Sequence, residues 1–375
     1  MNKNSFVNKE SMYQTITTLQ IKNDCLTLIG LQRVLSQPIL SLAFLPLYSL
    51  FVEEIENTIG QKGTLFKIQN ESPFKISNVR SKLKLFGSDR LGKSRKITSK
   101  LDEVQGEIYR SKLRFDFTKN LNIHYNLGIF FNEEGRVLGN TQYFYYMFQE
   151  QETSDREYEI EEIKAFSQAL GTVISSVDSG LKDVLPNDKV IIKEKNYSIR
   201  YKDFNTDRVQ FCKFGNNPLR KEISLILLHV LSNINFVRFV LDEVLTRDNT
   251  YLFRVKYISF YYTCKSIQKI LEFLKRKGMD DSIFIELEEL VKGSQYLLDS
   301  EFRNCMMHYS FKNKEKYLID DSRLDINILL YGLVETRFEG MGFYDLNDKV
   351  TTHINAFSDS IEKILDISTS GLKNL

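Results

Sequence analysis

Cysteine is scarce in this sequence, with four residues among 375. They lie far apart and lack the paired spacing that a zinc site or a redox-active dithiol requires. No other convincing cluster of ligands is evident, so we predict no metal centre and no cofactor. Thiols with this distribution suit a reducing cytosol, and we expect a cytoplasmic protein. The cysteines are Cys25, Cys212, Cys264 and Cys305.

An excess of charge of one sign is also lacking, because 51 lysines and arginines face 49 acidic residues and leave a net charge of +2. Any affinity for RNA must therefore come from a local cluster of basic residues. The phosphate-binding pattern G-x-x-x-x-G-K-[ST] is absent as well, which argues against ATP hydrolysis.

Long apolar runs are missing too. The N-terminal residues, MNKNSFVNKESMYQTI, are polar and do not resemble a secretion signal. The longest apolar stretch, residues 38–52, contains Pro46 and falls short of the roughly 20 residues that span a bilayer. We interpret it as a buried or kinked helix, and we expect no membrane partner.

The composition that remains is typical of an ordered protein, with few prolines, 42% hydrophobic residues and 27% charged residues. A chain of this length favours two folding units. We place the boundary at Gly215-Asn216-Asn217-Pro218, where an asparagine cap precedes a proline suited to the first turn of a helix. The predicted units are residues 1–215 and 216–375.

The first unit is predicted to be a mixed α+β domain. Residues 10–60 have a helical pattern that ends near Gly60. Apolar and polar residues then alternate over 64–86 and 107–149, as antiparallel strands require, with hairpin turns at Lys119-Asn120 and Glu133-Glu134-Gly135. The other predicted elements are a helix from the acidic run 150–162 to about Leu181, a hairpin over 189–201 that turns near Lys195-Asn196, and a strand over 209–214.

The second unit is predicted to be an all-α bundle of long helices joined by short loops. Asp248 is a candidate cap for the second helix, and the basic residues before Gly278 predict its end. The predicted helices cover residues 219–245, 250–277, a span from Asp280 to about residue 308, 325–338 and 348–367.

One segment of the third of these helices has the features of a reaction site. It reads Arg303-Asn304-Cys305-Met306-Met307-His308-Tyr309. Residues five apart lie roughly 140° around an ideal helix, so Arg303 and His308 can act together only if the helix ends near His308 or a twofold partner supplies the second group. Asn304 and His308 share a face, and Asp299, four residues before Arg303, is placed to hold the guanidinium.

These residue types suit the cleavage of RNA without a metal. Histidine titrates near neutral pH and can move the proton of the attacking 2′-hydroxyl or of the leaving oxygen. Arginine is always charged and can bind the phosphate through two donors while negative charge develops on it.

The segment resembles the R-x4-6-H signature of the HEPN superfamily (higher eukaryote and prokaryote nucleotide-binding domains), many of whose members are metal-independent ribonucleases. The resemblance covers about residues 216–370. It implies a HEPN-like helical bundle, a homodimer whose motifs face each other in a cleft, and an endoribonuclease that leaves a 2′,3′-cyclic phosphate. Arg303 and His308 would be catalytic, with Asn304 orienting or binding, and Tyr309 flanking the site.

Many such proteins act in bacterial anti-phage defence or as toxins, so the resemblance also implies an antitoxin or a phage-derived trigger as a partner. The N-terminal unit would then be a sensor or regulator. Because some HEPN proteins have lost catalysis, the alternative is a non-catalytic module that binds nucleotide or RNA or serves as a scaffold. A CARF-type sensor for cyclic oligonucleotides fits less well, since that domain is parallel and doubly wound.

Simpler interpretations remain open for each of these features. Arg303 would pair with Asp299 and His308 with the backbone if both were structural. A basic cluster within residues 75–100 would bind RNA phosphates or an acidic effector, or would be a solvated loop. The aromatic run 143–146 would stack on bases, or would split between the core and the surface of a strand. The weak RNA-binding candidates in the basic cluster are Arg80, Lys82, Lys84, Arg90, Lys93, Arg95 and Lys96.

Overall fold

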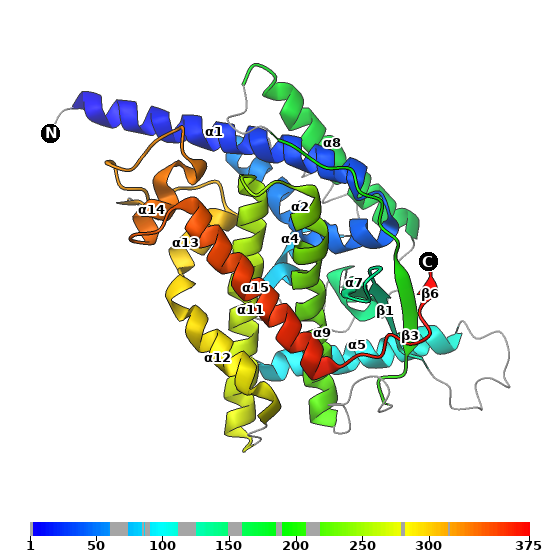
Figure 1. Ribbon diagram of the computed structural model, residues 1–375. Coiled ribbons are helices and arrows are strands. Elements are labelled where there is room, and N and C mark those ends of the chain that lie inside the picture. The colour runs from blue at the N-terminus through cyan, green and yellow to red at the C-terminus, as the bar shows by residue number, and fades with distance from the viewer. Residues whose placement is uncertain are drawn as a thin grey trace.

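The computed structural model describes residues 3–60, 74–84, 86, 91–111, 125–148, 160–184, 190–207, 218–278, 282–313 and 316–375. It is mostly helical, with a four-stranded antiparallel sheet and a separate two-stranded one, which confirms the α+β class. Figure 1 shows the long helix α1 (Lys3–Val34) across one end of the molecule, above the helices of the C-terminal half. The four-stranded sheet lies at the right of this view, close to the C-terminus.

The N-terminal helical region is confirmed, with one break. Helix α1 is followed by α2 (Pro38–Ile59), which has proline in its first turn and ends at Gly60 with a left-handed φ of 76°. Among the described residues, two helical segments, Pro38–Ile59 and Lys221–Val244, are long and apolar enough to cross a membrane by length and composition. Their most apolar windows are 78% and 89% buried inside the protein, as in core helices.

Part of the predicted strand region is helical instead. Residues 76–84 form α4 (Ile76–Ser81) and a 3-10 turn, and α5 (Leu91–Ser111) extends through the first residues of the expected second strand region. Helix α7 (Thr141–Phe148) occupies the end of the same region, where a strand was predicted. The Asn140 side chain accepts a hydrogen bond from the Tyr143 backbone N–H and caps α7. Buried Tyr143, Phe144, Met147 and Phe148 then follow helical spacing, which the aromatic run had concealed.

The predicted hairpin at Glu133-Glu134-Gly135 is present, between β1 (Leu127–Phe131) and β2 (Val137–Asn140). In β1, Leu127, Ile129 and Phe131 are buried as predicted, but Gly128 is buried too, so burial does not alternate strictly along the strand. Leu113–Phe117, the turn at residues 119–120 and the strand over 209–214 lie outside the described residues.

The second predicted hairpin, over residues 189–201, is wrong. Residues 190–199 run without a turn, and Ile192 forms a single bridge with Leu245. The chain enters the sheet only at β3 (Arg200–Phe204), whose antiparallel partners are β1 and the C-terminal strand β6 (Lys373–Asn374). The strand order is therefore β2-β1-β3-β6.

The C-terminal half contains most of the predicted helices, with corrected ends. Helix α9 (Pro218–Phe236) continues through a π-helical turn into α10 (Asp242–Val244). Helix α11 (Thr250–Arg276) is capped by Asn249, which accepts a hydrogen bond from the Leu252 N–H, and not by Asp248. The next helix is broken into α12 (Ile285–Ser294) and α13 (Ser300–Met307).

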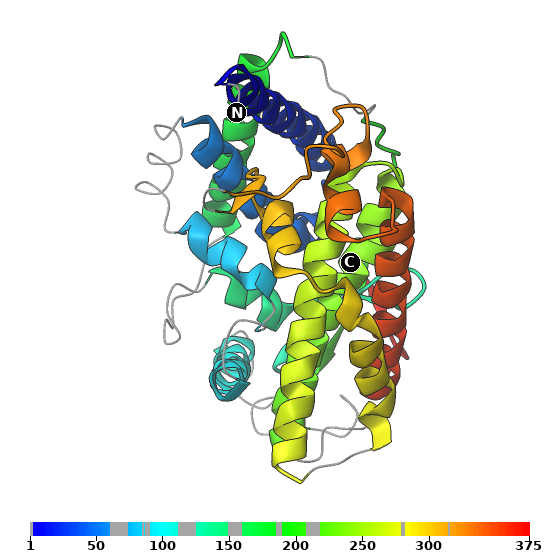
Figure 2. The same ribbon diagram turned by 90° about the vertical axis from the view of Figure 1, so that its left-hand side faces the viewer.

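The last two predicted helices differ in outcome. Only α14 (Leu333–Arg337) and a 3-10 turn form within 325–338, whereas α15 (Phe343–Leu365) is long. Helices α9, α11, α12 and α15 pack on one another, as Figure 2 shows from the side. They share one buried apolar cluster with α1, α2 and the sheet. The division at residue 215 stays a prediction.

Candidate functional site

The helix that carries Arg303, α13, is short and ends one residue before His308. Asp299 caps α13 by accepting hydrogen bonds from the backbone N–H groups of Glu301 (2.8 Å) and Phe302 (2.9 Å). The helix stops at Met307, and His308 has an extended backbone (φ −124°, ψ 157°). The imidazole therefore does not occupy the position, roughly 140° around the axis from Arg303, that a continued helix would give it.

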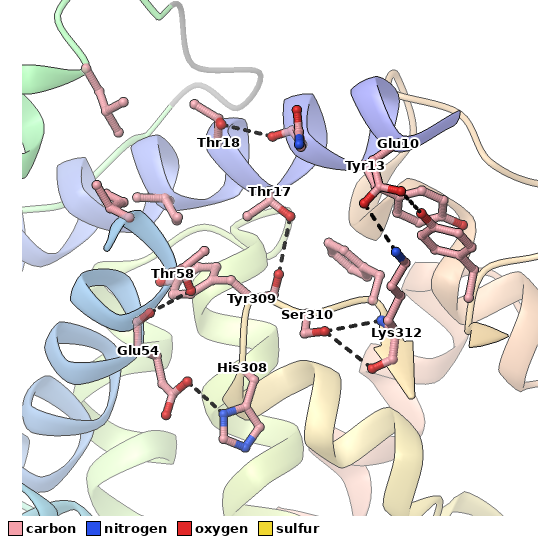
Figure 3. Close-up of a pocket in the computed structure, with 16 residues that line it drawn as sticks. Glu10, Tyr13, Thr17, Thr18, Glu54, Thr58, His308, Tyr309, Ser310 and Lys312 are labelled. Atoms are coloured by element: carbon pink, nitrogen blue, oxygen red, sulfur yellow. Dashed lines mark hydrogen bonds and ion pairs between the residues drawn. The ribbon is translucent and has the colours of Figure 1, made fainter. Parts of the chain in front are cut away.

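His308 is held by a glutamate from the N-terminal part of the chain. Its Nδ1 lies 2.7 Å from Oε2 of Glu54, a residue of α2 (Figure 3). The histidine side chain is 40% exposed and the glutamate side chain only 10%. This pair orients the imidazole and leaves the other ring nitrogen facing away from the carboxylate.

Arg80 completes the surroundings of this carboxylate. Its guanidinium is hydrogen-bonded to Glu54 and lies 2.9 Å from Glu53. Burial by itself would raise the pKa of Glu54, but the hydrogen bonds and charges of His308 and Arg80 outweigh it, so the pKa lies below its ordinary value. The carboxylate is ionised at neutral pH and can hold a positively charged imidazole.

Arg303 has a different environment from the predicted one. It donates a hydrogen bond to the Tyr262 hydroxyl (2.6 Å), and its guanidinium lies 5.0 Å and 5.4 Å from the ring centres of Tyr261 and Tyr262. Asp299 instead binds Arg337, at 2.9 Å and 2.6 Å. The expected Asp299–Arg303 pair is therefore wrong, because the carboxylate is directed to the start of the helix and Arg303 to α11.

Arg303 and Arg80 both affect the pKa of the Tyr262 hydroxyl. Burial raises the pKa of Tyr262, and the positive charges of Arg303 and Arg80 oppose that rise. Arg303 is bonded to this hydroxyl, whereas Arg80 is bonded to the glutamates of α2. Within the part of the chain that the structure describes, no hydrogen bond or ion pair joins Arg303 directly to His308.

The two supporting residues beside this group have separate roles. Asn304 is exposed, and its carbonyl accepts a hydrogen bond from the His308 N–H (2.9 Å). Tyr309 is buried, and its hydroxyl donates to Asp24 (2.6 Å). The first is accessible to a ligand, whereas the second anchors the segment to α1.

A buried ion pair beneath the motif was missed by sequence reasoning. Arg254 and Asp24 have fully buried side chains and are hydrogen-bonded to each other. The guanidinium lies between the rings of Phe51 (4.6 Å) and Tyr309 (4.7 Å), and its Nε donates to the carbonyl of Met306 (3.0 Å). Arg254 thereby fixes the end of α13. An arginine within the apolar-rich helix over 250–277 was the only signal for it in the sequence.

A pocket of about 680 Å³ opens beside His308, between α1, α2 and the segment after α13 (Figure 3). Its outer wall is held by Glu10, which accepts hydrogen bonds from Lys312 (3.2 Å) and Tyr317 (3.1 Å). Tyr13 stacks on Tyr317 at 4.0 Å between ring centres. Glu54, His308 and Tyr309 all line this pocket.

The described part of the predicted basic cluster is divided among α4, the 3-10 turn that follows it and α5. Arg80 binds the two glutamates of α2, and Arg95 of α5 binds Glu222. Lys82 lies 3.7 Å from the centre of the Tyr146 ring. Lys84 is half-buried, Lys93 and Lys96 are on the exposed face of α5, and Arg90 lies outside the described residues. Arg80, Lys82 and Arg95 therefore already have acidic or aromatic partners within the protein.

The described residues contain no group of three or more histidine, cysteine or acidic side chains arranged to hold a metal ion. Cys25, Cys264 and Cys305 are free and buried. No protein-family model, curated protein or solved structure matches the chain. The chemistry of the site therefore rests on its geometry alone.

Proposed function

We propose that this protein is a metal-independent endoribonuclease of HEPN type, with His308 and Arg303 as catalytic residues in a HEPN-like bundle. The observation that carries the proposal is the 2.7 Å contact between His308 and Glu54 on the wall of an open pocket. A histidine held by a buried carboxylate is a suitable general acid or base near neutral pH.

Each group has a defined part in the proposed reaction. His308 accepts the proton of a 2′-hydroxyl as that oxygen bonds to phosphorus, and the bond from phosphorus to the 5′-oxygen then breaks. A proton donated to the 5′-oxygen completes the step and leaves a 2′,3′-cyclic phosphate. Arg303 stabilises the charge that develops on the phosphoryl oxygens. Glu54 and Arg80 position the imidazole.

A homodimer fits this sequence of proton transfers. The reaction needs one group to accept a proton and another to donate one. A second copy that presents its own His308 supplies both at once, and a second Arg303 doubles the cationic charge around the phosphate. Bacterial defence or a regulated toxin, with an antitoxin or a phage-derived trigger, is the setting that we propose for this activity.

The test is an RNA digest in EDTA with the full chain, comparing wild type with Arg303→Ala and His308→Ala. We expect cleavage by wild type, termini with 2′,3′-cyclic phosphate, and a loss of at least about 100-fold for His308→Ala, as for removal of a general acid–base group. His353→Ala and the surface variant Arg247→Ala are matched controls and should keep full activity. Cleavage that survives in the His308→Ala protein would overturn the proposal.

A non-catalytic HEPN module that binds RNA or scaffolds a partner is the second candidate. It is favoured by the engagement of Arg303, whose guanidinium already donates to Tyr262 and lies over two rings. Under this function, the same digest would leave RNA intact, while a filter-binding assay would retain it with wild type and release it with Arg303→Ala.

A further inference from the structure

A second pocket, of about 660 Å³, lies near the start of α2, whereas Glu54 is near its end; the pocket is lined by residues of α2, α5, α7, α8 (Ile160–Gly180) and the sheet. Figure 1 shows α5, α7, β1 and β3 gathered in this part of the molecule. The pocket shares no lining residue with the one beside His308. Its walls are largely aromatic, from Tyr109, Tyr125, Phe130, Phe144, Tyr145 and Phe148.

The polar groups of this pocket are few and converge on one carboxylate. Asp203 of β3 lines the pocket and accepts a hydrogen bond at Oδ1 from the Tyr109 hydroxyl (2.8 Å). Among the described residues, its other oxygen has neither a hydrogen-bond nor an ion-pair partner. Apolar walls with a small number of fixed polar groups are the usual composition of small-molecule sites.

The charge of the lining selects the kind of ligand. Asp203 is acidic, and no lysine, arginine or histidine is present among the described residues that line the pocket. A phosphate or carboxylate would meet a negative charge there without a compensating donor. A positive charge would pair with Asp203 and would also be attracted to the faces of the surrounding rings.

The rings determine the rest of the ligand. Tyr125 is 43% exposed and contributes an accessible aromatic face to the pocket. Phe130 and Phe144 stack on each other at 5.8 Å and form a rigid wall. Aromatic faces of this kind favour a planar ring in offset or edge-on contact.

From this geometry, we propose that the pocket binds an aromatic cation, with its charged group at Asp203 and its ring among the aromatic side chains. This site is separate from the proposed nuclease site and does not depend on it.

Tryptamine is a suitable probe because the protein contains no tryptophan, so the indole fluorescence can be followed in the full chain without background from that residue. Indole-3-acetate carries the same ring with a negative charge and is the matched comparison. We expect tryptamine to bind saturably and indole-3-acetate to bind at least about tenfold more weakly, which corresponds to the loss of one charge-assisted hydrogen bond.

Two variants locate the binding. Asp203→Asn keeps an oxygen for the Tyr109 hydroxyl and should weaken tryptamine at least about tenfold. Tyr125→Ser changes an exposed side chain, should leave folding intact and should also weaken binding. The controls Asp348→Asn and Tyr296→Ser alter exposed residues elsewhere and should bind tryptamine as wild type does. Absence of saturable binding, equal binding of the two indoles, or unchanged binding by either pocket variant overturns the proposal.

Discussion

Glu54 and His308 lie 254 positions apart in the sequence, yet their side chains are 2.7 Å apart. The contact joins α2 to the residue that ends α13. It gives the histidine a fixed orientation, and it makes the N-terminal half part of the candidate site. Any function assigned to the Arg303–His308 motif therefore depends on both halves of the chain.

Glu54→Gln should make the free energy of unfolding vary less with pH in the acidic range. In the folded protein the pKa of Glu54 lies below its ordinary value of 4.5. The ionised carboxylate therefore contributes fully to the free energy of unfolding above pH 4.5, and this contribution is lost as the pH falls through the folded pKa. At pH 7 we expect the variant to be less stable by about 1–3 kcal/mol. The difference should shrink below pH 4.5 in urea unfolding. An equal deficit at all pH values would contradict the assigned ion pair.

His229→Phe should remove a second acid-sensitive group. His229 lies between the rings of Phe86 and Tyr143 at 5.9 Å and 5.5 Å, and neither ring nitrogen has a hydrogen-bond partner among the described residues. Burial lowers its pKa from 6.5 to about 3.

The unfolded chain therefore takes up a proton at His229 that the folded chain does not. The free energy of unfolding is unaffected by this group above pH 6.5. As the pH is lowered from 6.5 to 3, it falls by up to about 1.4 kcal/mol per pH unit. Thermal unfolding across this range should show a smaller decline for His229→Phe than for wild type. A variant that declines as steeply as wild type would show that His229 is not neutral in the fold.

Asp24→Ala should be among the most destabilising single changes in the chain. It leaves the guanidinium of Arg254 buried without its ionic partner, which costs about 3–5 kcal/mol. The comparison is Asp348→Ala, which breaks an exposed pair with Arg247 and should cost less than about 1 kcal/mol. Urea unfolding of both variants measures the two costs. Similar values for the two would mean that the buried pair does not carry this energy.

Two glycine substitutions should have opposite effects. Gly332 has a φ of +89°, and a Cβ at that position would overlap the backbone carbonyl oxygen of Arg323, so Gly332→Ala should destabilise by more than about 1 kcal/mol. Gly293 lies in α12 with open space around it, so Gly293→Ala should stabilise by about 0.5–1 kcal/mol. The melting temperatures of the two variants should move in opposite directions from wild type.

Local signals predicted the ends of elements well. Gly60 ends α2, Pro218 begins α9, and Gly135 lies in the turn of the first hairpin, because each residue has a backbone preference that acts over a few neighbours. Where two such residues compete, the sequence is ambiguous: Asp248 and Asn249 are both good caps, and only the second is used.

Periodicity was less reliable where aromatic residues are dense. The run from Tyr143 to Phe148 shows apolar residues at nearly every position, so strand and helix spacings both fit it. Asn140, three residues before Tyr143, was the available sign of a helix start. The same ambiguity placed Glu107–Ser111 in a strand rather than in α5.

The candidate site could be located from the sequence but not assembled. Arg303 and His308 are singled out by the sequence, and their action as a pair stays a prediction. Their partners Glu54, Arg80 and Tyr262 come from segments that are remote in the sequence and meet only in the tertiary structure. The predicted Asp299–Arg303 pair failed for a different reason. An aspartate at the start of a helix has a stronger local use as a cap, and Arg337 satisfies its charge.

The position of Arg254 has a consequence for work with fragments. A piece that begins at residue 216 would retain this guanidinium and the helix that holds it, but would be without the carboxylate of Asp24 and the ring of Phe51. The isolated C-terminal half would then enclose an uncompensated cation or open to admit water around it. Co-expression of the two halves, rather than expression of the second alone, is the way to recover a soluble folded product from split genes.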